Sequence, residues 1–266
     1  MGSTHKICQD YALSESRHIF PYIIVSDGCS SSPDTDIGAR IISCRARENI
    51  FKIMNMLSKD TAEAVYSIFG YEVINESRAI AHNLGLPMSC LDATLLVSVI
   101  RNNDIYTFMY GDGVIMSRKR SGVAYFMSRD FQSNAPYYLS YWADNARREM
   151  YKKEYGNMSI RLEVYDIEGN PMRITPPEIL PYDHKFISVE PLEDYQSITI
   201  GSDGVKSLVD ITGSKEIGPK DSLSLIEFKN TAGEFLKRRV LKATKDWSKA
   251  NIQHTDDLGL AGFHIE

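Results

Sequence analysis

The 266-residue sequence has no hydrophobic run approaching the ~20 residues that a membrane-spanning helix needs, and it has no long block of basic residues. Its 30 Lys and Arg are outnumbered by 35 Asp and Glu, which gives a formal net charge of -5. We therefore expect no nucleic-acid partner and no membrane association. Residues 1–6 lead into no signal-peptide core, and we expect a cytoplasmic protein.

Several reactive-site patterns are also missing. The cysteines Cys8, Cys29, Cys44 and Cys90 form no Cys-x-x-Cys pair, which argues against a zinc knuckle and a disulfide framework. No two histidines have the His-x-x-x-His spacing of a zinc site. The phosphate loop Gly-x-x-x-x-Gly-Lys-Ser and the serine elbow Gly-x-Ser-x-Gly are absent, so neither P-loop nucleotide binding nor serine-nucleophile hydrolysis is supported.

What the sequence does contain is a carboxylate at the end of several strand-like segments. Runs of β-branched and aromatic residues end at Asp27-Gly28, Asp112-Gly113 and Asp203-Gly204, Asp10 heads the first such run, and Asp256-Asp257 opens the last. Mg²⁺ and Mn²⁺ prefer oxygen ligands, and glycine lets a backbone carbonyl approach an ion closely. A single Asp-Gly pair is usually a hairpin turn, but the set predicts one metal site.

The hydrophobic periodicity predicts an order of strands and helices. Strands are expected at residues 5–13 and 18–26, in an antiparallel meander over 93–100, 105–110 and 114–118, and at the C-terminal end. Helices are expected at about 36–57, with Asp34 or Asp36 as the cap, and at 61–84, 143–153 and 222–249. Strands and helices that occur in separate blocks favour the α+β class and a layered sandwich.

Residues 1–266 contain no internal repeat and no linker-like change in composition, so we expect a single domain. Residues 132–190 mix tyrosines, prolines and a short helical stretch, and we expect a mobile or inserted flap region there. Within it, the aromatic segment 136–142 is either part of a substrate-binding flap or an ordinary hydrophobic cluster.

These acidic motifs, taken in order, resemble those of the metal-dependent serine/threonine protein phosphatases of type 2C, the PPM family. The motifs are Gln9-Asp10, Asp27-Gly28, Gly111-Asp112, Ser202-Asp203-Gly204 and Asp256-Asp257. The resemblance spans nearly the whole chain, and the opening Cys8-Gln9-Asp10 is most similar to a bacterial branch of the family. It implies a four-layer α-β-β-α sandwich of two antiparallel sheets flanked by helix pairs, with a dinuclear Mn²⁺ or Mg²⁺ centre at the sheet edge.

The resemblance also implies roles for individual residues. Asp27 would bridge both ions, the Gly28 carbonyl would bind one, and Asp203 and Asp256 would complete the other. Asp10 would bind waters held by the metal, and Asp112 with Asp203 matches the place of a third, weaker ion. A bridging hydroxide would attack phosphorus in line, so that Asp10, Asp27, Asp203 and Asp256 form the catalytic set.

The sequence departs from the family pattern at the start of the chain. The arginine that usually grips the substrate phosphate is replaced by His5, so His5 and Lys6 are the candidates for substrate binding, and a packed or exposed His5 is the alternative. Cys29-Ser30-Ser31-Ser32 replaces the usual glycine pair. Alignment to the family favours Asp256 over Asp257 as the ligand, a choice that would turn the side chain to the other strand face.

The leading hypothesis is a phosphatase that hydrolyses phosphoserine or phosphothreonine in proteins and opposes a partner Ser/Thr kinase. Two alternatives stay open: a catalytically weak phosphatase-like binding or regulatory module, and a phosphomonoesterase for a small molecule. The retention of Asp27, Asp203 and Asp256 together argues against the binding module, because clustered carboxylates without a cation repel one another.

Overall fold

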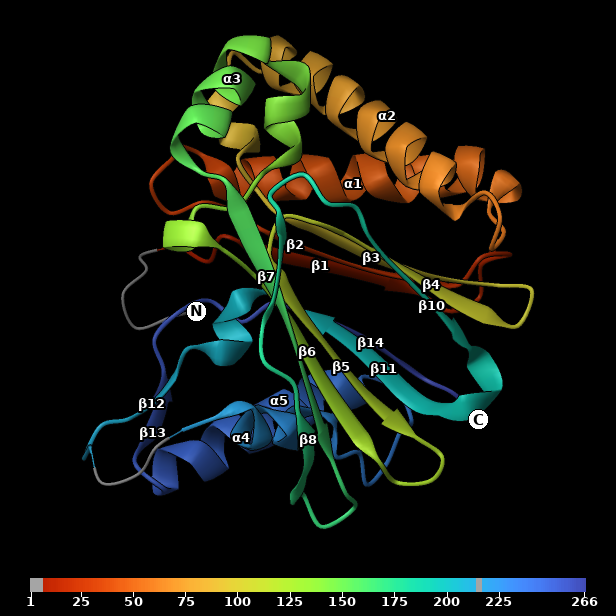
Figure 1. Cartoon of the computed structure of the whole chain (residues 1–266). Coiled ribbons are helices and arrows are strands. Elements are labelled where there is room, and N and C mark those ends of the chain that lie inside the picture. The colour runs from red at the N-terminus through yellow and green to blue at the C-terminus, as the bar shows by residue number, and fades with distance from the viewer. Residues whose placement is uncertain (1–6, 214–216) are drawn as a thin grey trace.

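A computed structural model describes residues 7–213 and 217–266 of the chain, and two large antiparallel sheets face each other at its centre (Figure 1). The first sheet has the order β1 (Asp10–Glu15), β2 (Tyr22–Asp27), β3 (Leu95–Arg101), β4 (Asp104–Tyr110) and β10 (Phe186–Pro191). The second has the order β14 (Leu260–His264), β11 (Tyr195–Gly201), β5 (Gly113–Lys119), β6 (Ala124–Phe131), β7 (Asn157–Tyr165) and β8 (Pro171–Ile174). The α+β class and the two antiparallel sheets that the sequence predicts are confirmed.

Smaller strands complete the topology: β9 (Glu178–Pro181) pairs with β7, and β12 (Leu208–Asp210) pairs with β13 (Ile252–His254). Segment 132–190 thus supplies β7 and β8 to the second sheet and β10 to the first.

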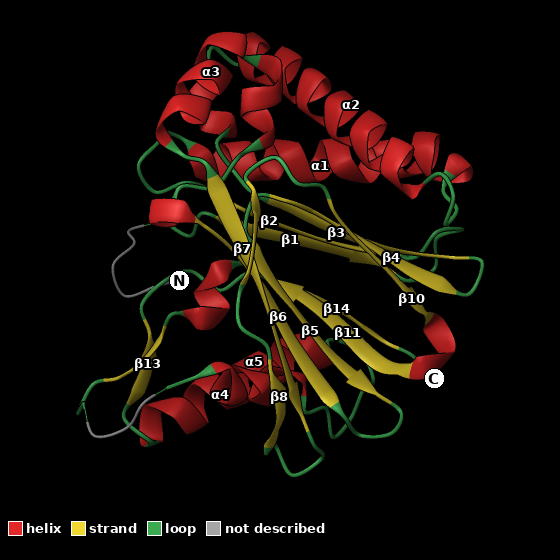
Figure 2. Ribbon diagram, viewed as in Figure 1, coloured by secondary structure: helices red, strands yellow, loops and turns green. Residues whose placement is uncertain are grey.

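Helices lie outside both sheets (Figure 2). Helices α1 (Thr35–Ile53) and α2 (Ala62–Asn83) cover the first sheet, and α3 (Asn145–Glu154) lies beside α2. Helices α4 (Pro219–Leu223) and α5 (Phe235–Lys249) lie on the far side of the second sheet. Among residues 7–213 and 217–266, no helix combines the length and the hydrophobicity that crossing a bilayer requires.

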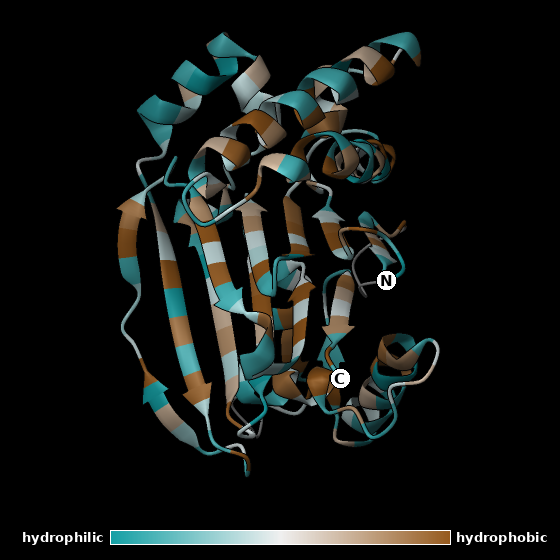
Figure 3. Cartoon of the chain, turned by 90° about the vertical axis from the view of Figure 1, so that its right-hand side faces the viewer, coloured by the Kyte–Doolittle hydropathy of each residue, from teal (hydrophilic) through white to brown (hydrophobic). Residues whose placement is uncertain are grey.

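The alternation of strand side chains builds separate hydrophobic layers. On β2, Ile24 packs with the residues of α1 and α2, whereas Ile23 and Val25 pack against the second sheet, where they meet Ile198 and Ile200. Figure 3 shows hydrophobic residues recurring along the strands and on one side of the helices. Each fully buried hydrophobic side chain stabilises the fold by about 1.5–3 kcal/mol, so these layers keep the strands and their ends in fixed positions.

The predicted meander over residues 93–118 is wrong at its last step. Strands β3 and β4 form a hairpin, but β5 belongs to the other sheet, where it pairs with β6 and β11. The chain crosses between the sheets at Gly111-Asp112-Gly113, and both glycines have positive φ (89° and 141°), a conformation that other residues rarely adopt. The crossing places Asp112 between the two sheets.

Three local predictions also differ from the structure. The predicted helix 222–249 is interrupted between η7 (Ser224–Ile226) and α5, where Gly233 has a φ of 58°. Asp34 precedes α1 in a left-handed conformation and its side chain makes no capping hydrogen bond, while Asp36 lies inside the first turn. Strand β1 begins at Asp10 and continues to Glu15, two residues beyond the end of the predicted strand 5–13.

Candidate active site

The predicted acidic residues come together at one edge of the sandwich. Asp27 ends β2, Asp203 begins η6 (Asp203–Lys206) directly after β11, and Asp256 follows β13. These three carboxylates, with Gly28 and Asp112, line a pocket of about 320 Å³, which we call the active-site pocket. Four chain segments that are distant in the sequence, each at the end of a strand, therefore contribute acidic residues to one cavity.

Hydrogen bonds to neighbouring strands fix the backbone around Asp27. The Asp27 N–H donates to Thr94 Oγ1 (3.1 Å), and the Thr94 N–H donates to the Asp27 carbonyl (2.8 Å). The Gly28 N–H donates to the Gln9 carbonyl (3.2 Å). A Cβ at position 28 would lie 2.7 Å from the Thr35 carbonyl oxygen, closer than real Cβ contacts, so only glycine allows α1 to begin this close.

Asp10 lies beside the pocket and is oriented by Ser202. Its Cα is paired with that of Asp27 across β1 and β2. Ser202 Oγ donates to Asp10 Oδ2 (2.7 Å) and accepts from the Gly259 N–H (3.0 Å). The other oxygen, Asp10 Oδ1, is buried without a hydrogen-bond partner, so it is free to accept a donor or a cation.

Burial and mutual repulsion raise the pKa of four carboxyl groups, those of Asp10, Asp27, Asp112 and Asp203. Burial, with the nearby charges of Asp257 and Asp203, raises the pKa of Asp10 to about 6. Burial and Asp203 raise the pKa of Asp112 to about 7. The pKa values of Asp27 and Asp203 are also raised, mainly by burial. The site therefore holds protons near neutral pH unless other cations replace them.

The structure separates the two neighbouring aspartates near the C-terminus. Asp256 lines the active-site pocket, whereas Asp257 is 1% exposed and its Oδ2 accepts a hydrogen bond from the Gln9 N–H (2.8 Å). The Asp257 N–H in turn donates to Asp256 Oδ1 (2.8 Å). The structure thus places Asp256 on the pocket and buries Asp257, while the choice of Asp256 as the metal ligand stays a prediction.

The residues suit a hard divalent cation. Within the described residues, no group of three or more Asp, Glu, His or Cys side chains already surrounds an ion-sized point. The carboxyl groups of Asp10, Asp27 and Asp203 instead lie close enough to shift one another's pKa. The unpartnered Asp10 Oδ1, the raised pKa values and the all-oxygen donor set fit Mg²⁺ or Mn²⁺, whose charge removes the repulsion.

The sequence interpretation missed the groups that surround the acidic cluster. Tyr138 lines the pocket, whereas Tyr137 and Tyr141 belong to a separate hydrophobic cluster; a role of segment 136–142 as a substrate-binding flap stays a prediction. Lys206, one turn after Asp203, has a charge that lowers the pKa of Asp203 and Asp112. The sequence feature that could have identified Lys206 is its position three residues after Asp203. His5 and Lys6 lie outside the described residues.

A third missed residue is Asp92, which supports the loop after Gly28. Asp92 is 3% exposed and accepts hydrogen bonds from Ser32 Oγ (2.9 Å), Ser140 Oγ (2.7 Å) and Arg147 Nη2 (2.8 Å). Its backbone carbonyl also accepts from the Cys29 N–H (2.8 Å). Asp92 therefore ties the pocket loop to η4 (Leu139–Ala143) and α3.

Comparison with known proteins gives a consistent family and fold. The profile of the family "Protein phosphatase 2C" matches residues 3–224. Serine/threonine phosphatase Stp1 from Staphylococcus aureus has 11% identity and a TM-score of 0.56, over 100% of this chain and 92% of that one.

Two further solved structures share the fold. The S. agalactiae serine/threonine phosphatase has 15% identity and a TM-score of 0.56, over 100% and 96% of the two chains. PppA, a key regulatory component of T6SS in Pseudomonas aeruginosa, has 15% identity and a TM-score of 0.52, over 98% and 92%. No curated protein sequence matches this chain significantly.

Proposed function

Because the chain belongs to the protein phosphatase 2C family and is a metal-dependent protein phosphatase, we propose that its acidic pocket holds two Mn²⁺ or Mg²⁺ ions. Asp27 and the Gly28 carbonyl would hold them from the end of β2, with Asp203 from η6 and Asp256 from the loop between β13 and β14. The observation that carries the proposal is the convergence of carboxylates from separate strand ends in a single pocket, where burial raises the pKa of Asp27, Asp112 and Asp203. Asp112, with Asp203, would hold a third ion.

Bound ions would supply an activated water at neutral pH and positive charge for the phosphoryl oxygens. The chain itself orients the acidic groups: Ser202 holds Asp10, and Thr94 holds the backbone of Asp27. The buried carboxylates hold protons when the cations are absent, because burial and their neighbours raise the pKa of Asp10 and Asp27. Ion loading and proton release are therefore coupled in this proposal.

The proposed substrate is phosphoserine or phosphothreonine within a protein, with a Ser/Thr kinase as the opposing partner. His5 and Lys6, outside the described residues, are the proposed phosphate contacts. We also propose that residues 1–266 act as one phosphatase domain in which segment 132–190 covers the substrate. Ser133 and Asn134, which line the pocket with φ values of 57° and 52°, support this because such strain is typical of functional loops.

The test is hydrolysis of para-nitrophenyl phosphate and of a phosphothreonine peptide with Mn²⁺, with Mg²⁺ and with EDTA. Asp27→Asn and Asp203→Asn are expected to reduce kcat/KM by about 100-fold or more, with weaker Mn²⁺ binding by calorimetry. Asp246→Asn, an exposed position on α5, is the matched control and should retain wild-type turnover. Metal-independent turnover, or full activity in both variants, would contradict the proposal.

A further inference from the structure

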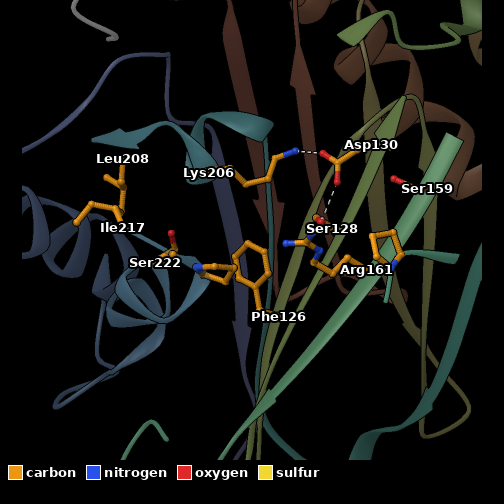
Figure 4. A pocket seen from close by; sticks show the side chains of 12 residues that line it. Phe126, Ser128, Asp130, Ser159, Arg161, Lys206, Leu208, Ile217 and Ser222 are labelled. Carbon is orange, nitrogen blue, oxygen red and sulfur yellow. Dashed lines mark hydrogen bonds and ion pairs between the residues drawn. The ribbon is translucent and has the colours of Figure 1, made fainter. Parts of the chain in front are cut away.

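A second pocket lies between β6, β7 and the beginning of α4, and we call it the side pocket (Figure 4). Its volume is about 300 Å³, at the small end of ligand sites, which suits one side chain. Phe126, Leu208 and Ile217 give it apolar walls, whereas Arg161 and Lys206 bring positive charge to it. None of these five residues lines the active-site pocket.

The two pockets share their dividing wall. Segment η6 places Asp203 in the active-site pocket and Lys206 in the side pocket. Likewise Asp130, near the end of β6, lines the side pocket, and Ser133 lines the active-site pocket. An ion pair between Lys206 and Asp130 joins these two segments on the side-pocket side of the wall, and Asp130 Oδ2 also accepts from Ser128 Oγ (3.0 Å) (Figure 4).

The distance along η6 from Asp203 to Lys206 sets how many residues of an extended peptide reach from the active-site pocket to the side pocket. Three residues of 3-10 helix advance about 6 Å, which is close to the length of two residues of extended peptide. Side chains two residues apart in an extended peptide also point to the same side. A substrate whose phosphorylated residue occupies the active-site pocket therefore presents the side chain two positions away to the side pocket.

The charges of the side pocket select among side chains. Lys206 is already neutralised by Asp130, but Arg161 is 48% exposed and its one ion pair in the described part of the chain, with Glu163 Oε1, is long at 3.7 Å. Glu163 is also engaged by the Tyr165 hydroxyl. The Arg161 guanidinium thus keeps donors available for a carboxylate at the mouth of an otherwise apolar cavity.

We propose that the side pocket binds an acidic side chain of the phosphoprotein substrate, two residues from the phosphorylated one. Its methylene groups pack on Phe126 and Leu208, and its carboxylate meets Arg161. This inference rests on the proposed function, because it assigns sequence preference to the same reaction.

The test compares phosphothreonine peptides that differ only in Glu or Lys at the second residue before or after the phosphothreonine. For the wild type, kcat/KM is expected to be about fivefold higher for the Glu peptide at one of these positions. Arg161→Glu should reverse the ratio in favour of Lys. Arg78→Glu, an exposed residue on α2 outside both pockets, carries the same change of charge and should keep the wild-type ratio.

A binding measurement separates this inference from the proposed function. Labelled peptides with a non-hydrolysable phosphonate are titrated into both variants and the wild type, and the Glu-to-Lys affinity ratio should follow the same pattern. Equal ratios for the wild type and Arg161→Glu in both assays would overturn the inference while turnover leaves the proposed function intact. Absence of all turnover would count against the proposed function, and the affinity ratio would still test the side pocket.

Discussion

The backbone N–H of Gln9 donates a 2.8 Å hydrogen bond to Asp257 Oδ2, which joins the beginning of β1 to the loop before β14 across 248 residues. Through this contact the buried Asp257 fixes the backbone on which Asp256 faces the active-site pocket. The two adjacent carboxylates therefore have different duties: Asp256 faces the proposed ions, and Asp257 supports the fold.

We expect Asp256→Asn and Asp257→Ala to fail in different ways. Asp256→Asn should lower kcat/KM at least about tenfold while the free energy of unfolding changes little, because a pocket-facing ligand is lost. Asp257→Ala should lower the free energy of unfolding by about 1–3 kcal/mol, because the Gln9 N–H loses its acceptor. Urea unfolding and para-nitrophenyl phosphate turnover measure the two effects, and the reverse pattern would exchange the two roles.

The metal-free protein should lose stability as pH rises, in part through Asp112. Its folded pKa is about 7, above the unfolded value of about 3.9, so this carboxyl contributes stability below about pH 4 that is lost as pH rises through 7. In EDTA at pH 8, Asp112→Asn should exceed the wild type by at least about 1 kcal/mol of unfolding free energy.

Near pH 5 the same comparison should show a much smaller difference, because the wild-type carboxyl group is then protonated and uncharged in the folded state. Thermal unfolding of both proteins across pH 4–8 measures the trend. A difference that is the same at pH 5 and pH 8 would show that Asp112 does not titrate in this range.

Gly204 should tolerate no side chain. A Cβ at this position would lie 1.6 Å from the Asp257 carbonyl oxygen, which is backbone and cannot move without shifting the loop that carries Asp256. We expect Gly204→Ala to cost about 3 kcal/mol or more of unfolding free energy and to reduce turnover. Gly156→Ala is the control, since no atom lies within 4 Å of its added Cβ. Equal melting temperatures for both variants would refute this packing argument.

Asp92 should matter for stability far more than an ordinary surface carboxylate. Asp92→Ala removes the acceptor of Ser32, Ser140 and Arg147 at once and leaves a partly buried cation, so the expected loss is about 3–5 kcal/mol. It should also raise KM, because the loop that begins at Cys29 lines the active-site pocket. Chemical denaturation and steady-state kinetics provide the two readouts.

The control for this prediction is Asp194→Ala, which breaks the exposed Lys119–Asp194 pair and should cost no more than about 1 kcal/mol. Similar losses of unfolding free energy in the two variants would mean that the Asp92 cluster contributes no more than a surface ion pair.

The positions of Asp27, Asp112 and Asp203 could be predicted because the signal for each is local. An apolar strand that ends in an aspartate is recognisable within ten residues, since strand alternation and the oxygen preference of hard cations need no distant partner. The long helices α1 and α2 followed from their hydrophobic spacing for the same reason. The end of α1 lies at Ile53 instead of about residue 57, because the chain tightens there into a 3-10 turn, Met54–Met56.

Other features could not be predicted because distant contacts decide them. Strand β5 looks like the third strand of a meander, but its hydrophobic residues are buried better in the second sheet, against β6 and β11. The Lys206–Asp130 pair links residues 76 apart, and the partners of Asp92 come from loops on both sides of it in the sequence. No local pattern marks residues whose partners lie so far along the chain.

The sequence by itself therefore determined the family and the candidate residues: aspartates at strand ends, in the order of a type 2C phosphatase. The tertiary structure alone decided that Asp256 faces the active-site pocket while Asp257 is buried. It also decided that Arg161 lines the side pocket, next to the pocket that holds the acidic cluster. The physical reason is that residue type and strand periodicity act over a few neighbouring residues, whereas pocket walls form only when separate strands pack together.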